Sequence, residues 1–200
     1  LAANDNEPMA HYYKFALTGD KAELEKAENS SSLYCFPNRI EDIEVLQYAV
    51  DNDGNYAAYY LGNLFYDKLR WEESVALWQS CADKINLPTV YRNLSLAYYN
   101  KMNDADKARA SMEKAFSMDK TDARVFFELD QLYKVLNLSL AERLDSMNAN
   151  ADLLEKRDDL YTEYITLLNL NGEYENAYNR IMNHNFHPWE GGEGKIPAQY

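Results

Sequence analysis

Apolar residues return every three or four positions along most of the chain, which is the spacing of one buried face of an α-helix. The stretch that begins at Asn55 can be aligned with the stretch that begins at Pro88. In that alignment the small residue Gly62 falls on the small residue Ser95, and the apolar positions around them coincide. The pattern therefore predicts amphipathic helices that recur as units along the chain.

One large side chain marks the length of the unit. Its slot is occupied by Phe65, Tyr98, Tyr133 and Leu168, which are 33, 35 and 35 residues apart. That period is close to the roughly 34 residues of a repeated helix–turn–helix unit. The sequence therefore predicts four repeats, over residues 55–87, 88–121, 122–157 and 158–185.

Small residues at fixed positions indicate how the two helices of a unit pack. One position of the unit holds the small residues Gly62 and Ser95. A second position, further along the unit, holds Ser74, Ala108 and Ala177. Small side chains let two antiparallel helices approach closely while large ones fill the gaps. The third unit differs, because Asp130 takes the first slot and Ala141 lies one position from the second. An all-α fold of antiparallel helix pairs is the prediction.

These units resemble the tetratricopeptide-repeat (TPR) family over roughly residues 40 to 185. The resemblance implies a right-handed superhelix, a TPR-like α-solenoid. It also implies that the first helix of each unit lines a concave groove and that the second helix faces outward.

Groove positions follow from this implied architecture. They recur near the second, fifth, ninth and twelfth positions of each unit. Aromatic, amide and basic members of the set are the candidates for partner binding: Tyr56, Tyr59, Asn63, Tyr66, Arg92, Tyr99, Arg124, Phe127, Gln131 and Lys134. The other groove positions hold Thr89, Leu96, Asp159, Thr162, Thr166 and Asn169.

The composition of this set favours a protein or an extended peptide as the partner. Tyrosine and arginine anchor many interfaces, because they bury a large area and make directed hydrogen bonds. The alternative is that several of these tyrosines pack between repeats and that the arginines pair with neighbouring acids. We expect no catalytic residues and no cofactor, because no nucleophile with a positioned base is recognisable.

For residues 1–54 the sequence predicts N-terminal helices and an incomplete leading repeat. Helices are expected over 6–16, over 20–28 and over 39–51, with a loop over 30–38. In the second helix Glu28 is assigned to the exposed face. In the third, Ile40 belongs to the apolar stripe, and Asp42 is assigned to a solvated face.

For residues 186–200 the sequence predicts a Gly-rich C-terminal loop that leads to a missing next unit. The run from Tyr91 to Tyr200, and above all the segment from Phe186 to Lys195 (FHPWEGGEGK), resembles the helical region of large bacterial TPR proteins that carry an uncharacterised N-terminal, mutarotase-like β domain. Candidate ligand residues in this loop are His187, Trp189, Glu190 and Glu193. The favoured interpretation is that the loop ends the helical array and binds neither a sugar nor a metal, because a lone Gly-rich loop is a weak motif.

Charge and cysteine content narrow the function classes. The net charge of −13 argues against a nucleic-acid partner, which needs clustered lysine and arginine. No apolar run is long enough to cross a membrane, so a soluble chain is expected, in the bacterial cytoplasm or periplasm. The only two cysteines, Cys35 and Cys81, are expected to be small buried hydrophobes.

The sequence predicts a non-catalytic scaffold that binds a protein or peptide, as one piece of a larger bacterial protein. Other domains of the same full-length chain are further candidate partners. The alternative is an accessory region of a carbohydrate-active protein, in which the loop around Trp189 contributes to a glycan site.

Overall fold

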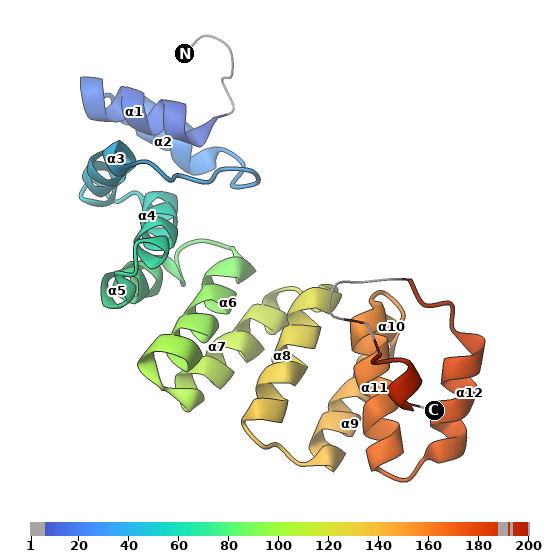
Figure 1. Cartoon of the computed structure of the whole chain (residues 1–200). Coiled ribbons are helices and arrows are strands. Elements are labelled where there is room, and N and C mark those ends of the chain that lie inside the picture. The colour runs from blue at the N-terminus through green and yellow to red at the C-terminus, as the bar shows by residue number, and fades with distance from the viewer. Residues whose placement is uncertain (1–6, 188–191, 193, 200) are drawn as a thin grey trace. The chain divides into compact units, whose positions relative to one another are not determined.

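A computed structural model describes residues 7–187, 192 and 194–199 (Figure 1). This described part of the chain consists of helices joined by turns and loops, and it contains no β-strand. The all-α prediction is confirmed. The chain divides into two compact units, Leu1–Asp104 and Ala105–Tyr200, and each is treated by itself below.

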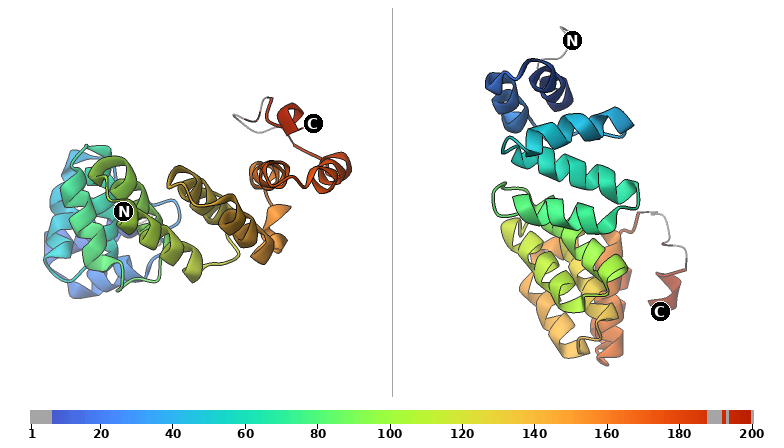
Figure 2. Two further views of the ribbon diagram at one scale, coloured as in Figure 1. Left: turned by 90° about the horizontal axis from the view of Figure 1, so that it is seen from below. Right: turned by 90° about the vertical axis from the view of Figure 1, so that its left-hand side faces the viewer.

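Unit 1 is a series of antiparallel helix pairs. In the two views of Figure 2, α4 and α5 lie side by side. The elements are α1 (Pro8–Thr18), α2 (Lys21–Asn29), α3 (Ile40–Val50), α4 (Asn55–Asp67), α5 (Trp71–Cys81), α6 (Pro88–Ala97) and the π-helical turn η1 (Tyr98–Met102).

Unit 2 continues with further helix pairs. Its elements are α7 (Ala105–Met118), α8 (Ala123–Val135), α9 (Leu140–Ala149), α10 (Ala151–Leu154), α11 (Asp158–Leu170), α12 (Tyr174–Asn183) and the short 3₁₀ turn η2 (Pro197–Gln199). The four repeat boundaries drawn from the sequence stay a prediction. No described helix combines the length and the apolar character that a membrane crossing requires.

Small residues lie where the pattern places them, with one exception. Ser74, Ala108 and Ala177 are all fully buried, and Gly62 on α4 lies directly against the indole of Trp78 on α5. Ala141 was the wrong choice for the third unit, because it is exposed on α9. Its neighbours Arg143 and Leu144 are buried instead.

On α3 the exposure of an apolar and an acidic residue is the reverse of what the sequence predicts. Ile40 is 77% exposed, whereas Asp42 is only 5% exposed. The Asp42 carboxylate accepts hydrogen bonds from the hydroxyl of Tyr13 (2.8 Å) and from the backbone N–H of Arg39 (3.0 Å). Asp42 therefore joins α1 to the beginning of α3, and the assignment of a solvated face to it was wrong.

Glu28 was also assigned wrongly to an exposed face. Its carboxylate accepts three backbone N–H groups at the beginning of α4, from Asn55 (2.8 Å), Tyr56 (2.8 Å) and Ala57 (3.0 Å). The Tyr12 hydroxyl also donates to it at 2.6 Å. A helix N-terminus carries unpaired N–H groups and a partial positive charge, so a carboxylate from α2 caps α4 in place of a local residue.

We expect Glu28→Gln to lower the free energy of unfolding by about 1–2 kcal/mol, because a neutral amide accepts more weakly from the three N–H groups and the helix dipole. Urea denaturation followed by circular dichroism measures this loss. Glu25→Gln, on the exposed face of the same helix, is the matched control. An equal effect of the two substitutions would show that the cap contributes nothing.

Candidate functional site

Four predicted groove residues lie on one face of α4. Tyr56, Tyr59, Asn63 and Tyr66 are spaced by three and four positions, and each is half-buried. The Tyr59 ring lies 5.4 Å from that of Tyr60, centroid to centroid. The Tyr66 ring lies 5.5 Å from that of Trp78. These tyrosines are thus partly packed in unit 1 and partly accessible.

Asn63 makes contacts within unit 1. Its amide oxygen accepts from Trp78 Nε1 (3.1 Å) and from Asn93 Nδ2 (3.0 Å). Asn63 therefore connects α4 to both α5 and α6 through hydrogen bonds, on the same face of α4 as the three tyrosines. The helical spacing does not predict this role for Asn93.

Arg92 and Tyr99 are the candidates that follow on α6 and η1. Arg92 is half-buried, and Tyr99 is 37% exposed. Burial raises the pKa of the Tyr59 hydroxyl, while a hydrogen bond with Asn63 and the positive charge of Arg92 oppose that rise. Arg92 therefore lies close enough to Tyr59 to influence it electrostatically.

In unit 2 the predicted groove residues of two helices surround one cavity. Its volume is about 470 Å³. Its lining includes Phe127, Gln131 and Lys134 from α8 and Asp159, Thr162, Glu163 and Thr166 from α11. The sequence assigned all of these except Glu163 to the groove. The remaining lining residues are Gly194, Lys195, Ala198 and Gln199, from the C-terminal segment.

Basic residues of this face have acidic neighbours. Lys134 Nζ lies 2.8 Å from Glu163 Oε1, and Arg124 Nε lies 3.2 Å from Glu128 Oε1. Burial alone would raise the pKa of Glu163, but hydrogen bonds from Lys134 and Arg143 outweigh it, so the pKa lies below its usual range. The positive charges expected on this face are thus offset by carboxylates.

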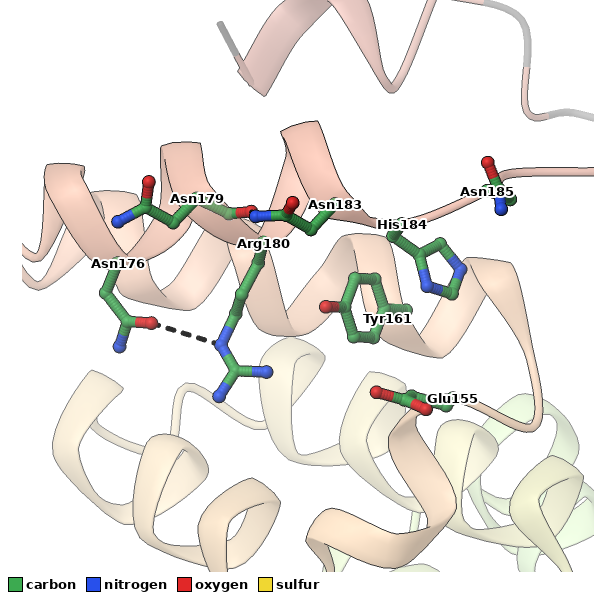
Figure 3. A pocket seen from close by; sticks show the side chains of 8 residues that line it. All are labelled: Glu155, Tyr161, Asn176, Asn179, Arg180, Asn183, His184 and Asn185. Atoms are coloured by element: carbon green, nitrogen blue, oxygen red, sulfur yellow. Dashed lines mark hydrogen bonds between the residues drawn. The ribbon is translucent and has the colours of Figure 1, made fainter.

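A second cavity of unit 2, which the sequence did not suggest, lies beside α12 (Figure 3). Its volume is about 540 Å³. Arg180 Nε donates to Asn176 Oδ1 at 3.1 Å, and its guanidinium lies 4.8 Å from the centroid of the Tyr164 ring. The other lining residues are Glu155, Tyr161, Asn179, Asn183, His184 and Asn185. The spacing of asparagines at 176, 179 and 183 was the available sequence signal, since it places them on one helix face.

The beginning of the C-terminal loop is held by Asp158, at the start of α11. His184 Nε2 lies 2.7 Å from Asp158 Oδ1, and the backbone N–H of His187 donates to Asp158 Oδ2 at 2.6 Å. The His184 ring also stacks on that of Tyr161. The other loop candidates, Trp189, Glu190 and Glu193, lie outside the described residues. Within the described residues no group of three or more histidine, cysteine or acidic side chains could hold a metal ion.

The short turn η2, near the end of the described chain, packs against α11 and α12. Asn169 Nδ2, in the last turn of α11, donates to the backbone oxygen of Gln199 at 3.1 Å. Asn169 is itself a predicted groove position. Residues 194–199 therefore lie against residues that the sequence predicts to line a groove, a return of the chain that the sequence did not predict.

Both cysteines are buried and free, as expected from their apolar neighbours. Burial raises the pKa of the Cys35 thiol to about 11 and that of Cys81 to about 12. A thiol reacts as the thiolate, so both side chains are poorly reactive at neutral pH.

Solved structures identify the fold. YrrB, described as a TPR protein with an unusual peptide-binding site, matches with a TM-score of 0.56 at 15% sequence identity, over 90% of this chain and 85% of that one. MamA matches with a TM-score of 0.58 at 10% identity, over 94% of this chain and 93% of that one. No family model matches the chain. The chain thus has the helical-repeat fold of TPR proteins.

Proposed function

We propose that the chain is a non-catalytic scaffold that binds an extended peptide or protein segment on the first-helix faces of its units. The four repeats over residues 55–185 and the ten partner-binding candidates belong to this proposal. The larger context, a bacterial protein with a mutarotase-like domain, rests on the resemblance of the run from Tyr91 to Tyr200, above all of the loop at Phe186–Lys195.

The observation that carries the proposal is the cavity between α8 and α11. It collects the groove positions of two consecutive predicted repeats, including Phe127, Gln131 and Thr166, and residues of the C-terminal segment line it as well. An extended peptide needs an apolar contact and amide or hydroxyl groups that pair with its backbone. Phe127 supplies the first, and Gln131 and Thr166 supply the second.

Unit 1 offers a face of related chemistry. Tyr59 and Tyr66 are held in place by ring contacts, so little side-chain entropy is lost when a partner covers them. Arg92 on α6 adds a positive charge that acts on Tyr59. The peptide-binding site noted for YrrB, a protein of the same fold, is in keeping with this use of the fold.

The proposal is tested by selecting peptides from a phage-displayed random library against the whole chain. The affinity of a selected peptide is then measured by isothermal titration calorimetry. We expect Tyr59→Ala, Arg92→Ala or Phe127→Ala to weaken it at least about tenfold, as truncation of an interface anchor does. The substitution with the largest effect identifies the unit that the peptide occupies.

Tyr34→Ala is the matched control for these substitutions. Tyr34 is 87% exposed in the loop between α2 and α3, and it is not one of the predicted groove positions. It should leave the affinity unchanged. If all three groove substitutions also leave it unchanged, the groove assignment is wrong.

A further inference from the structure

We propose that residues 194–199 occupy the peptide site of unit 2 in cis, so that an incoming peptide must displace the chain's own C-terminal segment. This inference rests on the proposed function, since it assigns an occupant to one of the proposed binding faces. It also indicates the chemistry that the site accepts: a short, turn-forming segment that is held through its backbone.

The first argument is the position of the segment. Gly194, Lys195, Ala198 and Gln199 share one cavity with Phe127 and Gln131 of α8 and with Thr166 of α11. η2 packs against α11 and α12, and Figure 1 shows it in red beside these helices. The segment therefore lies where the sequence predicts a bound peptide.

The second argument is the type of contact. Asn169 donates from its side-chain amide to the main-chain oxygen of Gln199 at 3.1 Å, and the side-chain oxygen of Gln199 lies 3.3 Å from the same nitrogen. An asparagine that pairs with a backbone carbonyl recognises an extended or turned chain with little dependence on its sequence. The contact can be exchanged for the same contact with another peptide.

The third argument is that the segment is internally ordered. The backbone N–H of Lys195 donates to Gly192 (3.1 Å), that of Ala198 to Gly194 (3.2 Å) and that of Gln199 to Ile196 (3.0 Å). Gly194 has a φ of +78°, and a Cβ added there would meet no atom within 4 Å. A substitution at Gly194 therefore disfavours this turn through the backbone alone and leaves the surface of α8 and α11 unchanged.

Gly194→Val in the whole chain separates the segment from the site. The probe is a fluorescein-labelled peptide of residues 194–199, and its binding is followed by fluorescence anisotropy. The strain of a β-branched residue at positive φ reduces self-occupancy, so we expect the variant to bind the probe about five- to thirtyfold more tightly than the unchanged chain. Gly19→Val is the control, because Gly19 also has positive φ (+70°) with open space around it but lies in unit 1.

Hydrogen exchange provides a second readout on the whole chain. Asn169→Ala removes the amide that holds Gln199, so exchange at the N–H groups of Ala198 and Gln199 should become at least about tenfold faster. Asn183→Ala on α12 is the control, since its side chain donates to the backbone oxygen of Asn179 and not to the segment. Equal exchange rates in these two variants, or equal probe binding by the Gly194→Val and unchanged chains, would overturn the proposal.

The outcomes separate this inference from the proposed function. If a library-selected peptide binds and loses affinity with Phe127→Ala, but Gly194→Val has no effect, then the groove binds peptides and is not self-occupied. If no library peptide binds even to the Gly194→Val chain while Asn169→Ala still accelerates exchange at residues 198 and 199, then the segment docks and the general peptide-binding function fails.

Discussion

Arg143→Met is expected to lower the free energy of unfolding by about 3–5 kcal/mol. Arg143 and Asp130 are 3% and 2% exposed, and their side chains make two hydrogen bonds, of 3.0 and 2.7 Å. Arg143 also donates to Glu163 Oε1 at 2.8 Å. Methionine fills a similar volume but leaves the Asp130 carboxylate buried without its cation, and the cost of that desolvated charge dominates.

Urea denaturation of the whole chain at neutral pH measures this cost. Lys134→Met is the matched control, because Lys134 contacts the same Glu163 but its side chain is 47% exposed. An exposed pair contributes little, so the control should lose less than about 1 kcal/mol. A loss in Arg143→Met no larger than in the control would show that the buried pair adds nothing beyond its exposed neighbour.

The pH dependence of Arg143→Met gives an independent check of the cause. Burial raises the pKa of Asp130 in the folded chain, and the hydrogen bonds from Arg143 oppose that rise. Without Arg143 the folded pKa rises further above the unfolded value, so the folded chain binds the extra proton as pH falls. The penalty should therefore be largest above the folded pKa and shrink toward acid pH.

Asp130→Asn in the Arg143→Met background tests the same point. It should recover part of the lost stability at neutral pH and remove the pH dependence, because an amide has no charge to desolvate. A pH dependence that persists in the double variant would assign it to another group.

The helical repeat was predictable because it depends on regular spacing within each unit. Ser74, Ala108 and Ala177 could be assigned to helix contacts from periodicity alone, and all three are buried. Asp130 was recognised as an irregular member of the same pattern. Its partner Arg143 was not, because a side chain thirteen positions away on another helix leaves no mark in a helical period.

Exposed and buried acids could not be distinguished from the sequence for the same reason. Glu28 and Asp42 lie on helices that are locally amphipathic, and a local pattern assigns carboxylates to solvent. In the fold the Glu28 carboxylate accepts from an N–H group at the beginning of α4. The Asp42 carboxylate accepts from the backbone N–H of Arg39, at the beginning of its own helix α3. The return of residues 194–199 to α11 is likewise a contact between distant segments, which spacing does not encode.

Gly62→Ala is expected to destabilise the chain by about 1–2 kcal/mol, because a steric cost of about 2–3 kcal/mol exceeds the gain of about 1 kcal/mol from the better helix former. A Cβ at position 62 would lie 2.5 Å from Trp78 Nε1 and 2.6 Å from its Cδ1. The indole is 2% exposed and donates to Asn63 Oδ1 at 3.1 Å, so it cannot move aside without losing this bond. Ser74 Oγ also donates to the Gly62 carbonyl at 2.7 Å, which holds α5 against α4. The steric term therefore exceeds the gain in helix propensity.

A double-variant cycle with Trp78→Leu tests this cause. Leucine removes the ring atoms that the new methyl group would meet, so the loss in the double variant should be at least about 1 kcal/mol smaller than the sum of the two single losses. Thermal and urea denaturation of the four chains, followed by circular dichroism, supply the free energies. Strict additivity would contradict the steric explanation, because it would mean that Gly62→Ala acts without involving Trp78. A favourable coupling would establish that the small residue at this slot is required by the opposing indole, which is the contact that sets the distance between α4 and α5.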